Sequence, residues 1–372
     1  MRVVLTHGYS VTNSGDGLLV EEAAALVREA FPGAEINLVA NDPESFRDQD
    51  LGRAVHPLLG DEEGSSLRQV KLGLKTLSKG RLRSDVAGLI DRADLVVAVG
   101  GGYLRSKTPL EAFKMVLTHY VQLPARQRTV PYIYLSQSIG PLRFGTLEPT
   151  RRRLGNASLV CVRDDRSLAL LSSLQNVQRT PDLALLGLPD EWRPEDVAQV
   201  RPNAKVGLVA RALSGSRSRV RKYDERIRDL ASADGIELLA QATARGNDDP
   251  AYYRGLGFDR EFRSLRAGVS KTSSDRVAVT VSVRLHGALQ SVRLGVPSVH
   301  LSYERKGFGA YDDLGLSRFV HNAYDFDPEA VRAQVSELRE DPTTYWDAVA
   351  HATATLRDRR QTLVDTLRGF KP

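Results

Sequence analysis

The chain has 372 residues, of which 41% are hydrophobic, and a formal net charge of +6. This size favours two domains of ordinary size. No apolar run approaches the ~18 residues of a membrane span, and the first residues lack the order of a secretory signal. We therefore expect a cytoplasmic protein. Its 52 basic residues are dispersed, and no nucleic-acid-binding motif accompanies them, so nucleic acid is not an expected partner.

The cysteine content limits the chemistry further. Cys161 is the single cysteine and lies in the apolar run 158–162, which excludes an intrachain disulfide and a cysteine metal cluster. We expect a buried thiol on a strand.

Short apolar runs alternate with helical patterns along the first half of the chain, which is typical of a parallel α/β sheet. We predict helices over 16–31, 110–123 and 165–172. The predicted strands cover residues 3–6, 35–39, 95–99, 132–136 and 159–162.

A proline-rich, charged segment over 187–204 separates this half from a second α/β series. The second series has predicted strands over 206–210, 236–240, 277–283 and 298–302, and residues 328–368 are predicted to be helical with a break near Asp341 and Pro342. The expected organisation is therefore an N-terminal Rossmann-like domain (1–190), a linker (191–204), a C-terminal Rossmann-like domain (205–325) and a helical tail (326–372) that packs back across the domains. This is a GT-B-like α/β fold, whose two parallel sheets face a cleft.

Polar or glycine-rich loops follow the predicted strands of the first half. The first strand leads into a polar turn that opens a helix near Asp16, where a helix cap and a ligand contact are equally plausible roles for the carboxylate. Three glycines at 100–102 permit close approach of a ligand to the backbone. Gln137 follows the fourth strand and Arg163 the fifth, so their side chains are expected at the ligand-binding edge of the sheet.

The second half carries the most distinctive cluster. Arg284 and His286 follow one predicted strand, and Lys306 follows the next. A guanidinium, an imidazole and an ammonium on adjacent strand ends suit a site that binds a phosphate or carboxylate and moves a proton. Arg211 and the basic segment 217–222 are further candidates for binding an anion, although a merely solvated loop explains that segment equally well.

The order of these motifs resembles the polysaccharide pyruvyl transferase family over roughly residues 3–316. The motifs that carry the resemblance are Asn13-Ser14-Gly15-Asp16, Gly100-Gly101-Gly102, Gln137 with Gly140-Pro141, Arg163 with Ser167, Pro181-Asp182, Arg284-Leu285-His286, Gly295-Val296-Pro297, and Tyr303 with Lys306. The chain departs from the family pattern at Ser136-Gln137-Ser138 and at Gly287.

The resemblance implies transfer of pyruvate from phosphoenolpyruvate to a sugar, usually as a ketal that bridges two hydroxyls. His286 is the candidate acid that protonates the donor, with Arg284 beside it as a catalytic group. The expected substrate-binding residues are Asn13, Asp16, Gly101, Gly102, Gln137, Arg163, Arg211, Tyr303 and Lys306. No cofactor and no metal are expected, because cationic side chains can stabilise the leaving phosphate.

Two alternatives stay open at this point: a GT-B glycosyltransferase that uses a nucleotide sugar, and a noncatalytic protein that binds carbohydrate or polyanions. The acceptor is equally open between a free glycan, a nucleotide-linked sugar and a lipid-linked sugar. The positive charge also suits peripheral association with the anionic inner face of a membrane.

Overall fold

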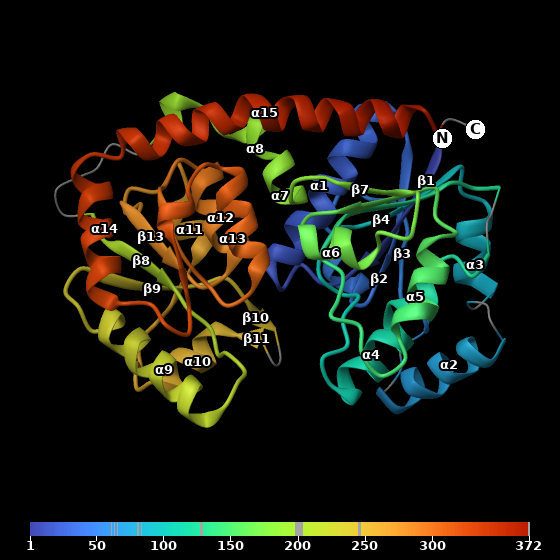
Figure 1. The fold of residues 1–372 in the computed structure, drawn as a ribbon, viewed down its shortest axis with the longest axis horizontal. Helices are drawn as coiled ribbons and strands as arrows, with labels where there is room; N and C mark the ends of the chain where they lie inside the picture. Colours follow the sequence, from blue (N-terminus) through green and yellow to red (C-terminus); the bar gives the residue numbers. More distant parts are fainter. Residues whose placement is uncertain are drawn as a thin grey trace. The chain divides into compact units, whose positions relative to one another are not determined.

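The computed structural model describes residues 1–60, 62, 64, 66–79, 82, 84–126, 129–197, 204–244 and 247–370. Internal contacts divide the chain into two units (Figure 1). The first unit comprises Met1–Val11, Asp16–Leu183 and Arg359–Pro372, and the second comprises Thr12–Gly15 and Ala184–Asp358. Residues 198–203 of the expected linker lie outside the described residues. The α/β class with a helical C-terminal region is confirmed.

The described part of the first unit contains a sheet of seven parallel strands in the order β3-β2-β1-β4-β5-β6-β7. The five predicted strands are all present. Two more, β3 and β7, are only two and three residues long, too short to leave an apolar pattern. The strands are β1 (Arg2–Gly8), β2 (Glu35–Ala40), β3 (Ala54–Val55), β4 (Leu95–Ala98), β5 (Tyr132–Gln137), β6 (Leu159–Val162) and β7 (Val177–Arg179).

The order of these strands reverses between β1 and β4, which is where open α/β sheets bind ligands. Strands β4 and β6 are buried along their whole length, as expected for parallel strands covered on both faces. Cys161 on β6 is buried as predicted, and burial raises the pKa of its thiol to about 11. The thiol is therefore buried and protonated at neutral pH.

Helices cover both faces of this sheet, as the apolar patterns require. In α1, Asp16 in the first turn and Arg28 in the last turn complement the helix dipole. The helical segments are α1 (Ser14–Ala30), η1 (Pro43–Phe46), α2 (Ser66–Lys79), α3 (Ser84–Asp91), α4 (Pro109–Thr118), η2 (Tyr120–Gln122), α5 (Leu147–Leu154), α6 (Asp165–Leu170) and α7 (Leu183–Leu186, which spans the boundary of the units).

In the second unit, the described residues form a sheet of six parallel strands in the order β12-β9-β8-β13-β14-β15 and a two-stranded antiparallel hairpin, β10-β11. The four predicted strands are present, and the short strands were missed. The strands are β8 (Val206–Val209), β9 (Ile236–Ala240), β10 (Thr243–Ala244), β11 (Asn247–Asp248), β12 (Arg263–Ser264), β13 (Val279–Ser282), β14 (Ser298–Ser302) and β15 (Val320–Asn322).

The predicted break in the C-terminal helical region is confirmed, because one helix ends at Glu340 and the next begins at Thr343. Arg360 in the last helix pairs with Glu22 and Glu29 of α1 within the first unit. None of the described helices has the length and apolar content needed to cross a bilayer. The remaining helical segments are α8 (Leu188–Glu191), η3 (Pro194–Asp196), α9 (Arg217–Ala231), α10 (Asp249–Gly255), α11 (Leu265–Val269), α12 (Leu285–Arg293), α13 (Arg305–Asp313), η4 (Ser317–Phe319), α14 (Pro328–Glu340) and α15 (Thr343–Arg368).

Candidate functional site

Arg163 lies just beyond the carboxyl end of β6 in the first unit, with a side chain that is only 1% exposed. Its Nη1 donates to Asp182, and its Nε donates to the Ser138 hydroxyl at 2.8 Å. Its Nη2 is buried and has no hydrogen-bond partner among the described residues. A buried guanidinium with an unused donor is costly to leave unsatisfied, so this nitrogen is suited to receive an anionic ligand.

The glycine turn after β4 leaves room beside this guanidinium. A Cβ on Gly102 would lie 3.6 Å from Arg163 Nη2. Gly101 has a φ of +153°, a backbone conformation that favours glycine, and its carbonyl accepts from the Ser138 N–H at 2.9 Å. The turn therefore binds the end of β5 and keeps side-chain atoms out of the space next to Arg163.

Gln137 at the end of β5 is fully buried. Its Nε2 donates to the Tyr134 hydroxyl at 2.6 Å, and no described residue bonds its Oε1. The side chain is thus fixed at one end and carries a spare acceptor at the other. The predicted residues Gly101, Gly102, Gln137 and Arg163 are consequently neighbours at the carboxyl edge of the first sheet.

Asp16 in the first turn of α1 accepts a hydrogen bond from the Tyr103 hydroxyl at 2.6 Å. Burial raises the pKa of Tyr103, and the Asp16 carboxylate raises it further, so the phenol remains a donor. The Tyr103 ring stacks on His119 with centroids 4.8 Å apart. Because α1 begins two residues earlier, Asp16 is not the helix cap that the sequence offered as one of its two roles.

His119 is part of a buried histidine pair. Its Nδ1 lies 3.3 Å from Nδ1 of His7, and the Nε2 of His7 lies 3.2 Å from the Tyr132 hydroxyl. Burial lowers the pKa of His119 to about 4, and burial together with His119 lowers that of His7 well below 6.5. His7 also has a φ of +64°, which is uncommon for a residue with a side chain. The pair is therefore neutral and tightly constrained in the folded protein.

These buried histidines predict a specific pH dependence of stability. Because their folded-state pKa values lie below the unfolded value of 6.5, the unfolded chain binds more protons as the pH falls. The free energy of unfolding should therefore decrease from pH 6.5 to 5, by up to about 1.4 kcal/mol per pH unit for each such histidine. Urea unfolding across this range measures the slope. His119→Phe should reduce the slope by the contribution of one histidine, because His7 and His300 also have lowered pKa values, whereas loss of the exposed His351 should leave it unchanged. Equal slopes in both variants would contradict the assignment.

Arg284 in the second unit follows β13 and is held by a buried carboxylate. Its Nε donates to the two oxygens of Asp249 at 3.0 and 2.9 Å, and its Nη2 bonds Asp249 and the Asn247 amide oxygen. Asp249 is 0% exposed and also accepts the backbone N–H groups of Gln241 and Ala242. Arg284 is thus fixed in position, and Nη1 is the nitrogen that neither Asp249 nor Asn247 engages.

His286 lies in the first turn of α12 and is partly exposed. The Asn13–Gly15 turn packs against it, because a Cβ on Gly15 would lie 2.6 Å from its Nδ1. The Asn13 side chain accepts from the Gly15 N–H at 3.3 Å and so holds this turn. A Cβ on Gly287 would lie 2.6 Å from Gln241 Oε1 and 3.0 Å from the Ser282 hydroxyl oxygen, so the side of α12 next to His286 is closely packed.

Arg211, after β8, donates from Nη1 to the Tyr303 hydroxyl at 3.2 Å. Lys306 in the first turn of α13 pairs with Glu304 at 3.1 Å. The ammonium also contributes to the environment of His300: burial lowers the pKa of His300 to about 4, its bond to Ser282 raises it, and Lys306 lowers it further. The predicted residues of the second unit thus form one polar edge at the carboxyl ends of β8, β13 and β14.

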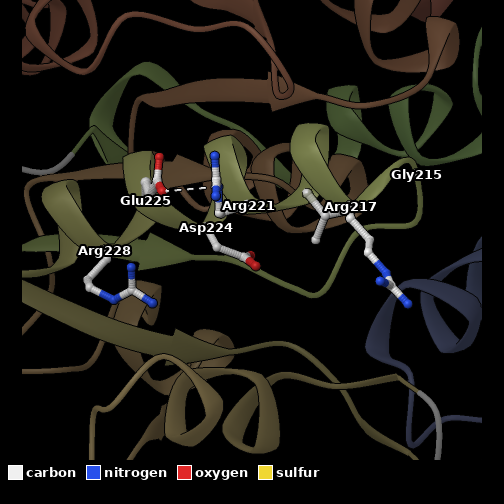
Figure 2. Close-up of a pocket in the computed structure, with 7 residues that line it drawn as sticks. Gly215, Arg217, Arg221, Asp224, Glu225 and Arg228 are labelled. Atoms are coloured by element: carbon white, nitrogen blue, oxygen red, sulfur yellow. Dashed lines mark ion pairs between the residues drawn. The ribbon is translucent and has the colours of Figure 1, made fainter.

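The basic segment 217–222 is helical, which corrects the expectation of a loop. It forms the start of α9, where a shallow hollow of about 380 Å³ is lined by Gly215, Arg217, Val220, Arg221, Asp224, Glu225 and Arg228 (Figure 2). Arg221 pairs with Glu225 at 3.6 Å, and the Arg217 side chain points away from this pair. Acidic residues therefore share this surface with the arginines.

Comparison with known proteins identifies the family. The model of the polysaccharide pyruvyl transferase family matches residues 13–305. The chain belongs to this family. A search of curated proteins returned no match.

The chain also resembles solved structures of GT-B-like fold. A UDP-GlcNAc 2-epimerase from Neisseria meningitidis, bound to UDP-GlcNAc, has a TM-score of 0.52 and 13% identity and covers 99% of each chain. A putative UDP-N-acetylglucosamine 2-epimerase from Listeria monocytogenes has a TM-score of 0.51 and 13% identity, over 94% of this chain and 91% of its own. At such identities these similarities establish the fold alone.

Sequence reasoning missed several residues that position the predicted site. Tyr103, which binds Asp16, follows directly after the glycine turn, and Asp182, which binds Arg163, belongs to the Pro181-Asp182 motif, whose spacing alone indicates no role for the carboxylate. Asp249 gave no signal beyond its place in the acidic run that precedes Pro250. A carboxylate that supports an arginine is far from it in sequence, so only the fold reveals the pairing.

Proposed function

We propose that this member of the polysaccharide pyruvyl transferase family moves the pyruvyl group of phosphoenolpyruvate to the hydroxyls of a sugar and releases phosphate. The observation that carries the proposal is Arg163 Nη2, a buried donor without a partner among the described residues, beside Gly102. It supports an anionic donor because a fixed guanidinium binds carboxylate or phosphate with directional hydrogen bonds. Family membership supports pyruvate as the group transferred.

His286 is the proposed acid. It protonates the methylene carbon of phosphoenolpyruvate, which makes C2 electrophilic, and a sugar hydroxyl then attacks C2 and loses its proton. The bond from C2 to the phosphate oxygen breaks, and a second hydroxyl closes the ketal. One hydroxyl proton replaces the one that His286 gave, and the other leaves with phosphate, so the reaction balances without an added oxidant or reductant.

Cationic side chains are proposed to bind the donor's two anionic groups. Arg163 in the first unit and Arg284, Lys306 and Arg211 in the second are the candidates for phosphate and carboxylate. Asp249 binds both Nε and Nη2 of the Arg284 guanidinium, which fixes its orientation before a ligand arrives and so lowers the entropy cost of binding. Asn13, Asp16, Gln137 and Tyr303 remain the proposed partners of substrate hydroxyl and carboxylate groups.

Gly102→Ala tests the role of Arg163 without removing its charge. The added Cβ would lie 3.6 Å from Nη2, an ordinary contact that occupies the space in front of this donor while Asp182 stays paired. We expect phosphoenolpyruvate to bind roughly 10- to 100-fold more weakly, the value of one hydrogen bond to a charged group. Isothermal titration measures the affinity and thermal unfolding checks the fold. Unchanged affinity in a folded variant would contradict the role.

The function itself is tested by phosphate release from phosphoenolpyruvate with a panel of galactosides, glucosides and mannosides, followed by acceptor mass. We expect acceptor-dependent release and a mass gain of one pyruvyl group. A glycosyltransferase would instead consume a nucleotide sugar and ignore phosphoenolpyruvate. A noncatalytic binding protein would bind sugar without turnover, and either outcome would refute the proposal.

The acceptor is proposed to be a sugar of a glycan precursor, free or linked to a nucleotide or a lipid. The same panel can be extended to nucleotide-linked and lipid-linked sugars. The sugar that supports the fastest phosphate release then indicates the class of acceptor. A lipid-linked acceptor would place the reaction at a membrane surface.

A further inference from the structure

We propose that α2, α4 and the turn at 143–145 of the first unit form a surface that docks on an anionic lipid bilayer. This inference goes beyond the proposed function and does not depend on it. The helices are in contact, since a Cβ on Gly73 of α2 would lie 2.8 Å from Leu117 of α4, and Figure 1 shows them side by side.

Large apolar side chains of this surface are exposed. Leu67 of α2 is 83% exposed and Leu74 is 50% exposed, and Leu110 of α4 is 62% exposed. Residues three, four or seven apart share one face of a helix, so Leu67 and Leu74 lie on the same stripe, and Leu110 shares a face with the exposed Phe113. Exposed apolar groups gathered on adjoining elements mark an interaction site.

The turn at 143–145 adds an aromatic side chain to the same surface. Ser106, just before α4, accepts from the Arg143 N–H at 2.7 Å and so ties the turn to this helix. Phe144 at its tip is 56% exposed with a φ of +55°, a conformation that bulky residues rarely adopt. An aromatic ring held outward by a strained backbone is consistent with a function that requires its exposure.

Lysines alternate with these apolar groups. Five of the ten lysines of the chain fall between residues 71 and 114, and α2 carries four basic residues and no acidic one. Lys71 and Lys75 are exposed on the α2 face that carries Leu74, and Lys114 follows Phe113 on α4. The acidic residue of α4, Glu111, is engaged by the Lys107 N–H and by Arg105. Arg68 of α2 pairs with Glu62, but the lysines outnumber the carboxylates of this surface, so it carries a net positive charge.

This combination favours a bilayer over a protein partner. Lysine is depleted in protein–protein interfaces, whereas an amphipathic helix with lysines beside its apolar face suits the headgroup region, where their long stems extend to anionic lipids. Each basic group near an anionic leaflet strengthens binding appreciably. A membrane that contains anionic lipid fits both the positive charge of this surface and its exposed apolar side chains.

Co-sedimentation of the full chain with vesicles tests the proposal. We expect binding to phosphatidylcholine vesicles that contain phosphatidylglycerol, weakening with added salt, and much less binding to pure phosphatidylcholine. The double variant Lys71→Gln, Lys114→Gln should bind roughly 30-fold more weakly. Leu67→Gln, Leu110→Gln should weaken binding at low and high salt alike, because it removes the inserted groups.

The matched control is Arg221→Gln, Lys222→Gln on α9, which removes the same charge from another exposed helix and should bind as the wild type does. If this control loses vesicle binding as much as the lysine variant does, the attraction is nonspecific and the proposal is wrong. The proposal is also wrong if the leucine variant binds vesicles as tightly as the wild type. The proposal is wrong if the wild type does not bind anionic vesicles. It is also wrong if the leucine substitutions convert a dimer to a monomer in sedimentation without weakening vesicle binding, because the surface would then be a protein interface. Thermal unfolding of each variant confirms that it is folded.

Discussion

Replacing His286 by Asn should lower the kcat of pyruvyl transfer by about 10²- to 10⁴-fold, the typical contribution of a positioned general acid. The affinity for phosphoenolpyruvate should change little, because the anion-binding cations remain in place. Phosphate release at saturating donor gives kcat, and isothermal titration gives the donor affinity. A loss of kcat with unchanged donor affinity indicates a general acid, whereas a residue that only binds the donor would lower the donor affinity.

His321→Asn is the matched control, because His321 lies in the same unit and bonds Gln334 of α14 instead of the strand-end site. It should retain the wild-type kcat. A His286→Asn enzyme with the kcat of the wild type would exclude His286 as the acid. If donor affinity and kcat were lost together in a folded variant, His286 would be a binding residue instead.

Replacing Asp249 by Ala should lower the free energy of unfolding by about 3–5 kcal/mol, because it leaves the buried Arg284 guanidinium without its counterion. Asp249 is 0% exposed, and it also accepts two backbone N–H groups that the variant leaves unsatisfied. Urea unfolding of both proteins measures the difference. The change should also weaken donor binding, since Arg284 loses the partner that orients it.

The neighbouring Asp248 provides the control, because its carboxylate caps α10 by accepting the Ala251 N–H at 2.9 Å. Asp248→Ala should cost only about 1 kcal/mol, the usual value of a helix cap. A double variant, Asp249→Leu with Arg284→Met, should recover part of the lost stability, because an apolar pair replaces the unpaired charge while the N–H groups of Gln241 and Ala242 still lack their acceptor. Similar losses for Asp248→Ala and Asp249→Ala would show that the buried ion pair is not the cause.

The local sequence determined the α/β class and the main strands. Runs such as 159–162 are apolar throughout because strands of a parallel sheet are buried on both faces. Such strands can therefore be recognised from the sequence alone. The order of polar residues after each strand also placed Arg163, Arg284 and Lys306 at strand ends. These features depend only on residues that are close to one another in the sequence, so the sequence is sufficient to predict them.

The tertiary structure decided which groups support those residues. Asp182 lies 19 positions from Arg163 and Asp249 lies 35 from Arg284, and the Asn13–Gly15 turn meets His286 from the other end of the chain. The sequence of 217–222 predicts a loop, although the segment is helical, because small and charged residues at the start of a helix carry little apolar periodicity. Buried charge requires a partner wherever the fold supplies one, and the identity of that partner is set by packing in three dimensions, which local pattern does not encode.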